Sequence, residues 1–336
     1  MVTHGDLERL VEEARKSYVV YGPVRKGTSY VFSRIESLSE VDLTYNRTIL
    51  PPKKLFHPPY ETLMRFKLGD GFEVEAKPSA EPIMLLGVHP CDLNAILRLD
   101  KFFARNYVDP YYTARREKSL IVALNCTGAK DEYCFCESLG TGPEAKEGYD
   151  LLLTELRGGE FLLEVGSPKG SGLVEGLDLS RAGPEHLEAK ERVLARARGT
   201  FVRRVDFEGL VPPPLEHPIW EEESRKCFSC GTCSLVCPTC YCYDMFDGVE
   251  LDLRTGFRAR RLDSCQLYEY SEVALGGNFR RERRARLRHW MTCKLGGAGG
   301  GQYSSCVGCG RCVAYCPARI DITRVASRLK EAMRYA

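Results

Sequence analysis

Apolar and polar residues follow two different periods along the first third of the chain. Four apolar residues recur on one helix face and predict a short helix over residues 6–18: Leu7, Leu10, Val11 and Ala14. Continuous apolar runs at 82–88 and 119–124 predict buried strands, and the stretch 92–103 between them has a helical pattern that Asp92 is placed to cap. Strand, helix and strand in this order indicate a parallel α/β core.

Further elements are predicted up to residue 198. Residues 19–35 predict two strands about a turn, and the proline-rich stretch 44–60 predicts an extended, ordered loop. Apolar stretches at 149–156 and 161–165 predict a hairpin that turns at a Gly-Gly pair, and 184–198 reads as an amphipathic helix.

The second half of the chain contains two copies of one cysteine spacing, C-x2-C-x2-C-x3-C-P. The first run consists of Cys227, Cys230, Cys233 and Cys237, followed by Pro238. The second run consists of Cys306, Cys309, Cys312 and Cys316, followed by Pro317. This spacing is typical of bacterial ferredoxins, in which each run gives three ligands to one [4Fe-4S] cluster and its fourth cysteine to the other.

Crossing the ligands in this way predicts two [4Fe-4S] clusters. One would be bound by Cys227, Cys230, Cys233 and Cys316. The other would be bound by Cys306, Cys309, Cys312 and Cys237. Zinc is the alternative, but zinc sites usually combine two pairs of ligands and do not use four cysteines at this spacing twice.

The fold class that follows is α+β/α/β, with two domains. We expect an N-terminal α/β domain over residues 1–210 and a ferredoxin-like, two-cluster domain over 221–336, with an insertion between the cluster runs. The proline-rich stretch 211–220 is predicted to be a stiff connector between them.

Four more cysteines lie in the predicted N-terminal domain: Cys91, Cys126, Cys134 and Cys136. Cys91 and Cys126 follow the two buried strands, at the strand ends where open α/β sheets build their sites. The four could hold a third [4Fe-4S] cluster, with His89 a weaker ligand candidate. Alternatively, some of them are buried thiols that pack as small apolar side chains.

The last four cysteines lie within the predicted two-cluster domain: Cys240, Cys242, Cys265 and Cys293. Cys240 and Cys242 follow the first run so closely that they must lie near a cluster. We expect them to line its pocket and adjust its potential. The alternative is that they are ligands of a further centre.

Composition narrows the class of protein. A net charge of +2 gives no indication of nucleic-acid binding, and no apolar run approaches the roughly 18 residues of a membrane span. Sixteen cysteines without a secretory signal indicate metal ligands in a reducing compartment, so we expect a cytoplasmic protein. No dinucleotide-binding glycine motif is present.

The arginine-rich run 279–288 is either a solvated helix face or a docking surface for an acidic partner.

Several stretches together resemble a known family: residues 45–54, 87–92, 131–136, 237–242 and 263–266, with the two cysteine runs. They are similar to the β subunit of cytosolic sulfhydrogenases, which are heterotetrameric [NiFe] hydrogenases of archaea and some bacteria. The same pattern occurs in the A subunit of anaerobic sulfite reductases. The resemblance implies an iron–sulfur protein that works beside a flavin subunit handling NAD(P)H.

The leading hypothesis is therefore an electron-transfer subunit of a multi-subunit oxidoreductase, most simply a [NiFe] (sulf)hydrogenase, with no catalytic residue of its own. Expected partners are a flavin/NAD(P)H subunit, a catalytic hydrogenase or sulfite reductase subunit, and an external ferredoxin. Two other functions stay open. The N-terminal domain could bind a small substrate or flavin as a self-sufficient reductase, or the clusters could only stabilise the fold.

Overall fold

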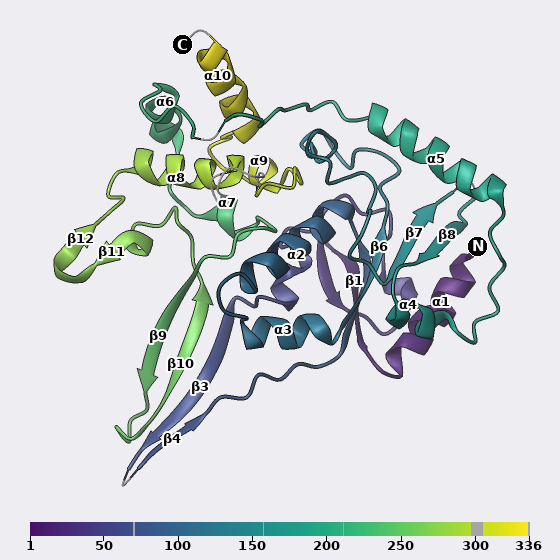
Figure 1. The fold of residues 1–336 in the computed structure, drawn as a ribbon, viewed down its shortest axis with the longest axis horizontal. Coiled ribbons are helices and arrows are strands. Elements are labelled where there is room, and N and C mark those ends of the chain that lie inside the picture. The colour runs from purple at the N-terminus through teal and green to yellow at the C-terminus, as the bar shows by residue number, and fades with distance from the viewer. Residues whose placement is uncertain (70, 157, 211, 297–304, 335–336) are drawn as a thin grey trace.

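The computed structural model describes residues 1–336 except 70, 157, 211, 297–304 and 335–336 (Figure 1). A six-stranded sheet forms the N-terminal part. In order across the sheet, its strands are β2 (Ser29–Arg34), β1 (Val19–Lys26), β5 (Ile83–Val88), β6 (Ser119–Leu124), β7 (Leu151–Glu155) and β8 (Phe161–Val165). The four central strands are parallel, and they include the predicted parallel pair β5 and β6; the two edge strands are antiparallel to their neighbours.

Helices cover both faces of this sheet. They are α1 (His4–Arg15), α2 (Pro90–Phe103), α3 (Pro110–Glu117), α4 (Pro168–Val174) and α5 (Pro184–Gly199). Alternate residues of β5 point to opposite faces: Met84 packs in one core with Leu10 of α1, and Leu85 packs in the other with Ile96 of α2. Burial on both faces explains why β5 and β6 are apolar throughout.

The expected capping role of Asp92 is wrong. Helix α2 begins at Pro90, and its N-cap is His89, which makes no side-chain cap. Proline suits the first helical position because its fixed φ matches the helix and the N–H that it lacks has no intrahelical acceptor there. The Asp92 carboxylate lies inside the first turn and forms a buried ion pair with Arg311, at 2.6 Å.

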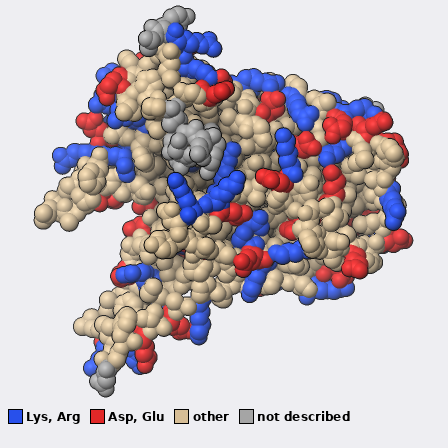
Figure 2. Space-filling view, viewed as in Figure 1, with Lys and Arg blue, Asp and Glu red and all other residues tan. Residues whose placement is uncertain are grey.

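A second sheet projects from the body as an arm (Figure 1). It contains, in order, β4 (Phe72–Glu75), β3 (Tyr60–Leu68), β10 (Thr255–Leu262) and β9 (Tyr243–Val249). Residues of both charges and uncharged residues are intermixed on it in Figure 2. The arm joins strands from both sides of the predicted domain boundary. The arm was not predicted from the sequence, because its strands are largely exposed and lack buried apolar runs.

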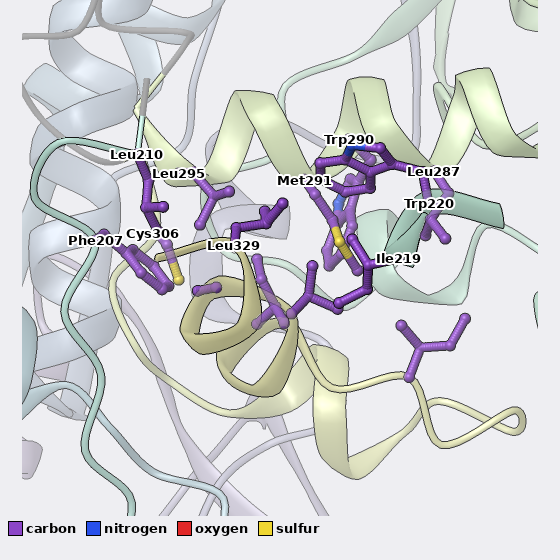
Figure 3. Packing of buried hydrophobic residues seen from close by; sticks show 14 of the residues in the cluster. Phe207, Leu210, Ile219, Trp220, Leu287, Trp290, Met291, Leu295, Cys306 and Leu329 are labelled. Carbon is purple, nitrogen blue, oxygen red and sulfur yellow. The ribbon is translucent and has the colours of Figure 1, made fainter. Parts of the chain in front are cut away.

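The C-terminal helical region, residues 219–242, 263–296 and 305–334, is built from short and medium helices. They are α6 (Ile219–Lys226), α7 (Thr232–Leu235), α8 (Arg283–Leu295), α9 (Arg311–Ala314) and α10 (Ile322–Arg334). Their buried core contains Trp220, Trp290, Met291 and Leu329 (Figure 3). Helix α6 begins inside the stretch expected to be a connector, because Ile219 and Trp220 are buried in this core.

The remaining elements are small. They are the hairpin strands β11 (Glu272–Val273) and β12 (Gly277–Asn278) and the 3-10 turns η1 (Leu38–Glu40), η2 (Pro52–Leu55), η3 (Glu137–Leu139), η4 (Glu269–Ser271) and η5 (Ala274–Gly276). Turn η2 lies within the stretch expected to be an extended loop. Among the described residues, no helix combines the length and apolarity needed to cross a membrane.

Candidate iron–sulfur centres

The two cysteine runs share one backbone conformation. Each leads into a short helix, α7 or α9, that follows a glycine with positive φ: Gly231 at 77° and Gly310 at 75°. Two residues before each glycine a second positive φ occurs, 54° at Ser229 and 64° at Gly308. The repeat that the sequence shows in its cysteines is therefore also a repeat in backbone geometry.

These turns direct backbone N–H groups at sulfur. The N–H of Ser229 donates to Cys227 Sγ at 3.3 Å, and the N–H of Gly308 donates to Cys306 Sγ at 3.4 Å. Hydrogen bonds to sulfur stabilise the thiolate form and are one means by which a protein sets the potential of an iron–sulfur cluster.

Five thiols drawn from both runs line one apolar cavity: Cys227, Cys230 and Cys233 of the first run, and Cys312 and Cys316 of the second. We call the first-run three together with Cys316 the first thiol set; Cys312 lies between this set and the second one described below. Leu287 and Trp290 contribute to the wall. Cys316 belongs to the second run but interacts electrostatically with Cys227 and Cys233. Burial raises the pKa of both of these thiols, so a cationic centre would be needed to hold them as thiolates.

The second thiol set has the reciprocal composition: Cys306, Cys309, Cys312 and Cys237. Cys237 comes from the first run, yet the other three members all interact with it electrostatically. A hydrogen bond from the Cys240 thiol, aided by the positive charges of Lys294 and Lys53, holds the pKa of Cys237 well below its usual value despite burial. The fourth cysteine of each run thus interacts with cysteines of the other run, and Cys237 also interacts with Cys233 of its own run.

Two buried lysines lie against the second thiol set. Lys53 and Lys294 are 3% and 2% exposed. Lys294 Nζ donates to Thr239 Oγ1 at 3.1 Å, and this hydroxyl lies 3.3 Å from Cys237 Sγ. Lys53 Nζ donates to the carbonyl oxygen of Cys240. A buried ammonium group is costly unless negative charge lies near it, so this environment suits an anionic, thiolate-ligated centre.

The N-terminal cysteines form a third thiol set: Cys91, Cys126, Cys134 and Cys136. Cys91 lies in the first turn of α2, after β5, and Cys126 follows β6, so the carboxyl ends of two parallel strands bring them together. Cys136 interacts with Cys91, Cys126 and Cys134, and it also interacts with Cys309 of the second set. Burial raises the pKa of Cys126 to about 12.

The loop that carries the third set packs directly on the second cysteine run. The N–H of Phe135 donates to the carbonyl oxygen of Gly308 at 2.9 Å. A Cβ at Gly308 would lie 2.5 Å from the backbone nitrogen of Cys136, and one at Gly310 would lie 2.5 Å from the carbonyl oxygen of Tyr133. Ser229 is the residue of the first run equivalent to Gly308. A side chain is tolerated at this position in the first run, where the loop of the third set does not approach, and excluded in the second run, where it does.

His89, the weaker ligand candidate, is stacked on Tyr45 with ring centroids 4.0 Å apart. Its Nε2 is buried and has no hydrogen-bond partner among the described residues. Burial and the charges of Lys130 and Arg311 keep its pKa well below the usual value, so the ring is neutral. Its observed contact is therefore a packing contact with Tyr45.

The last four cysteines divide by location. Cys240 adjoins Cys237 of the second set, and Cys293 Sγ lies 4.0 Å from Ser305 Oγ. Cys242 and Cys265 adjoin each other. This last pair is not evident from the sequence, because the two residues are 23 positions apart and no spacing motif marks them.

The arginine-rich run contains a structural residue that sequence reasoning missed. Arg286 is 5% exposed and donates to the carbonyl oxygen of Gln266 at 3.0 Å and to Ser229 Oγ at 3.3 Å. Arg283 Nη1 donates to the carbonyl oxygen of Cys227 at 3.0 Å. Part of this run therefore holds the loop of the first thiol set. Arg281 and Arg284 remain exposed.

Within the described ranges, no three His, Cys, Asp or Glu side chains are close enough to bind one metal ion. This finding concerns a single ion, whose thiolate ligands would lie about 2.3 Å from it in the case of zinc. A four-iron cluster spreads its ligands over four separate iron atoms. The donor chemistry of the first two sets, four thiols each with N–H groups directed at sulfur, fits such a cluster.

Comparison with known proteins agrees with this geometry. A family model described as a 4Fe-4S dicluster domain matches residues 226–320. The chain is 38% identical over 319 residues to the sulfhydrogenase 2 subunit beta of Pyrococcus furiosus, and the alignment covers 94% of this chain and 93% of that protein. No solved structure matches the chain. The resemblance predicted from the motifs is thereby confirmed, and the chain belongs to the sulfhydrogenase β-subunit family.

Proposed function

We propose that this chain is the iron–sulfur electron-transfer subunit of a multi-subunit hydrogenase of the sulfhydrogenase type. The observation that supports the proposal is that, in two runs of identical spacing, the fourth cysteine of each run interacts with cysteines of the other. Family membership and the dicluster match support the hydrogenase assignment. A [4Fe-4S] cluster gains and loses single electrons, and the surrounding protein sets the potential at which it does so.

The first and second thiol sets each bind one [4Fe-4S] cluster in this proposal. The chain's own residues supply the ligands, exclude water with the apolar wall around Leu287 and Trp290, and direct N–H groups at sulfur. Lys53 and Lys294 place positive charge beside the second set but not in the wall of the first. The two centres therefore differ in electrostatic environment although their ligands are alike.

The third thiol set binds a third [4Fe-4S] cluster. Support comes from the convergence of four cysteines at one sheet edge and from the packing of their loop on the second run. Interactions between Cys312 and Cys233 join the first and second sets, and those between Cys309 and Cys136 join the second and third. The proposed order is a chain of three centres with the second set in the middle.

The proposed partners are a flavin subunit that handles NAD(P)H and a catalytic hydrogenase subunit.

One surface suited to a partner is the β11–β12 hairpin, which projects at the left of the molecule in Figure 2 with basic residues at its base. Its neighbourhood exposes Leu275 fully and Phe279 by 81%, beside the exposed Arg281 and Arg284. Apolar anchors with a charged rim are typical of protein interfaces. Replacing Leu275 and Phe279 by serine should reduce co-purification of the other subunits without lowering the iron content of this chain.

The proposal is tested by analysing the protein purified without oxygen. We expect about twelve iron and twelve acid-labile sulfide per chain, in agreement with three [4Fe-4S] clusters, and reversible reduction by a low-potential donor. About eight would retain the two-cluster proposal and reject the third cluster. Zinc in place of iron would reject the proposal altogether, and clusters that cannot be reduced reversibly would leave only a structural role.

A further inference from the structure

Two thiols outside the three sets lie side by side where the hairpin β9–β10 returns to the C-terminal helical region. Cys242 directly precedes β9, and Cys265 follows β10. Tyr243 pairs with Leu262 at the ends of the two strands, and the N–H of Asp263 donates to the Cys242 carbonyl oxygen at 3.1 Å. This pairing brings the cysteines together, and the two thiols interact closely enough to shift the pKa of both.

The two thiols differ in environment. Cys242 is half-buried, whereas Cys265 is only 4% exposed. The Tyr270 hydroxyl also interacts with Cys242. The interactions with Cys265 and Tyr270, together with the charges of Lys294 and Lys53, lower the pKa of Cys242 to about 6, while the contact between the two thiols raises that of Cys265. Cys242 is thus the accessible thiolate and Cys265 the buried thiol.

The pair adjoins the first thiol set. Ser264 Oγ and Ser234 Oγ lie 2.7 Å apart, which holds the segment of Cys265 against helix α7. Cys265 interacts electrostatically with Cys233, a member of that set on the same helix. Both cysteines of the pair pack against the buried core of the region.

We propose that Cys242 and Cys265 form a redox-active dithiol that exchanges with the S–S bond of a small disulfide beside the first thiol set. Three features support this inference. The two thiols lie side by side, the Tyr270 hydroxyl lies at the more accessible thiol, Cys242, and the segment of Cys265 packs against helix α7. A nucleophilic thiolate with a resolving thiol next to it is the arrangement that thiol–disulfide exchange requires.

The exchange proceeds in two steps. The Cys242 thiolate attacks one sulfur of the disulfide, so a Cys242–substrate S–S bond forms and the substrate S–S bond breaks, releasing one thiolate. Cys265 then loses its proton to that thiolate and attacks Cys242 Sγ, which forms the Cys242–Cys265 disulfide and releases the second substrate thiolate. In sum the substrate gains two electrons and the dithiol loses two.

Restoring the dithiol takes two electrons and two protons. The reductant is a one-electron carrier of the iron–sulfur class, and this step alone rests on the proposed function. The exchange itself needs no cluster, so its outcome can be measured independently of the iron content.

The test uses the full chain purified without oxygen with its iron. The protein is incubated with excess bis(2-hydroxyethyl) disulfide, alkylated and digested, and the peptides are identified by mass spectrometry. We expect a peptide pair joined through Cys242 and Cys265. Cys265→Ser should stop at a mercaptoethanol adduct on Cys242, and Cys242→Ser should form neither product. Cys293→Ser, a cysteine change outside the pair, should react as the unsubstituted chain does.

A second measurement examines the role of Tyr270. Labelling of Cys242 by a short pulse of iodoacetamide should rise with pH to half its maximum near pH 6, because the thiolate is the reactive form. Tyr270→Phe removes the hydroxyl and should shift this midpoint to higher pH. An unchanged midpoint would contradict the assigned interaction of Tyr270 with Cys242 and with it the placement of a nucleophile at Cys242.

Two results would overturn the proposal. One is the absence of the joined peptides from the unsubstituted protein. The other is loss of about four irons from Cys242→Ser or Cys265→Ser, which would make these residues ligands of a further cluster. If the unsubstituted chain forms the joined peptides but contains no iron, the proposed electron-transfer function is rejected and the proposed dithiol is retained.

Discussion

At the scale of single residues, charge separates two sites that have the same ligands. The cavity of the first thiol set has apolar side chains such as Trp290 in its wall, and Arg283 and Arg286 donate to a carbonyl and a hydroxyl of its loop. In the second set, the buried ammonium groups of Lys53 and Lys294 act on the thiol of Cys237 itself. A positive charge stabilises the more negative, reduced state of a cluster. The second centre should therefore have the higher reduction potential of the two, and electrons that reach the first centre should pass on to it.

The contribution of the Lys294 charge to the reduction potential of the second centre can be measured by substitution. Lys294→Met keeps an unbranched side chain but removes the charge, so the potential of the second centre should fall by on the order of 50 mV, roughly a tenfold change in the one-electron equilibrium. The measurement is a potentiometric titration followed by EPR. Lys294→Arg should restore most of the potential, and Lys226→Met, at a half-exposed lysine, should change it little. Equal potentials in Lys294→Met and the unsubstituted chain would refute this electrostatic role.

At the scale of elements, the two cysteine runs are copies whose differences come from their neighbours. Gly308 combines a φ of 64° with a backbone contact that leaves no room for a Cβ, and Ser229 occupies the equivalent position of the first run. A left-handed φ alone is a modest cost for other residues, about 1–2 kcal/mol. The close approach of the third-set loop is therefore the larger constraint.

Comparing Gly308→Ala with Gly27→Ala should separate the cost of a left-handed φ from the cost of placing a Cβ against the loop of the third set. Gly27 has a φ of 60° and open space around its Cβ position. Gly27→Ala should lower the melting temperature only slightly, whereas Gly308→Ala should lower it by several degrees more and release iron from the third thiol set first. Thermal unfolding followed at the cluster absorbance measures both effects. Equal melting temperatures would mean that the loop does not pack on the second run.

The elements predicted correctly from sequence are those with a strong local signal. The apolar runs of β5 and β6 and the cysteine spacing needed no knowledge of distant residues. The arm of β3, β4, β9 and β10 was missed because its strands are largely exposed and its two hairpins are joined only by the pairing of β3 with β10, nearly two hundred residues apart in sequence. Asp92 was misassigned for a related reason: its partner Arg311 is 219 residues away, and short-range patterns cannot reveal it.

At the scale of the whole molecule, the two halves of the chain are joined by buried polar contacts. Both side chains of the Asp92–Arg311 pair are 1% exposed, and Arg311 also donates to the carbonyl oxygen of Thr48 at 2.8 Å. This pair connects helix α2, which carries Cys91, to helix α9, which carries Cys312. The second and third thiol sets are therefore held at a fixed separation by an ion pair as well as by packing.

Asp92→Asn should destabilise the protein strongly. The change leaves the Arg311 guanidinium buried without its carboxylate, a situation that typically costs about 3–5 kcal/mol. Asp247→Asn is the matched control, because Asp247 pairs with Arg258 at 2.7 Å but both side chains are nearly half exposed. Its cost should stay within about 1 kcal/mol. Comparable shifts in melting temperature for the two variants would show that the buried Asp92–Arg311 pair contributes no more to stability than an exposed pair, and would argue against its role in connecting the two halves of the chain.

The central claim is that each cysteine run completes the centre of the other, and Cys237 and Cys316 test it most directly. In protein purified without oxygen, Cys237→Ser should perturb the EPR signal and iron retention of the centre bound by Cys306, Cys309 and Cys312. Cys316→Ser should perturb the centre bound by Cys227, Cys230 and Cys233. Cys306→Ser and Cys227→Ser provide reference spectra in which each centre is altered through a member of its own run. If each run completes the centre of the other, the spectrum of Cys237→Ser should resemble that of Cys306→Ser, and the spectrum of Cys316→Ser that of Cys227→Ser; the opposite pairing of spectra would contradict this exchange.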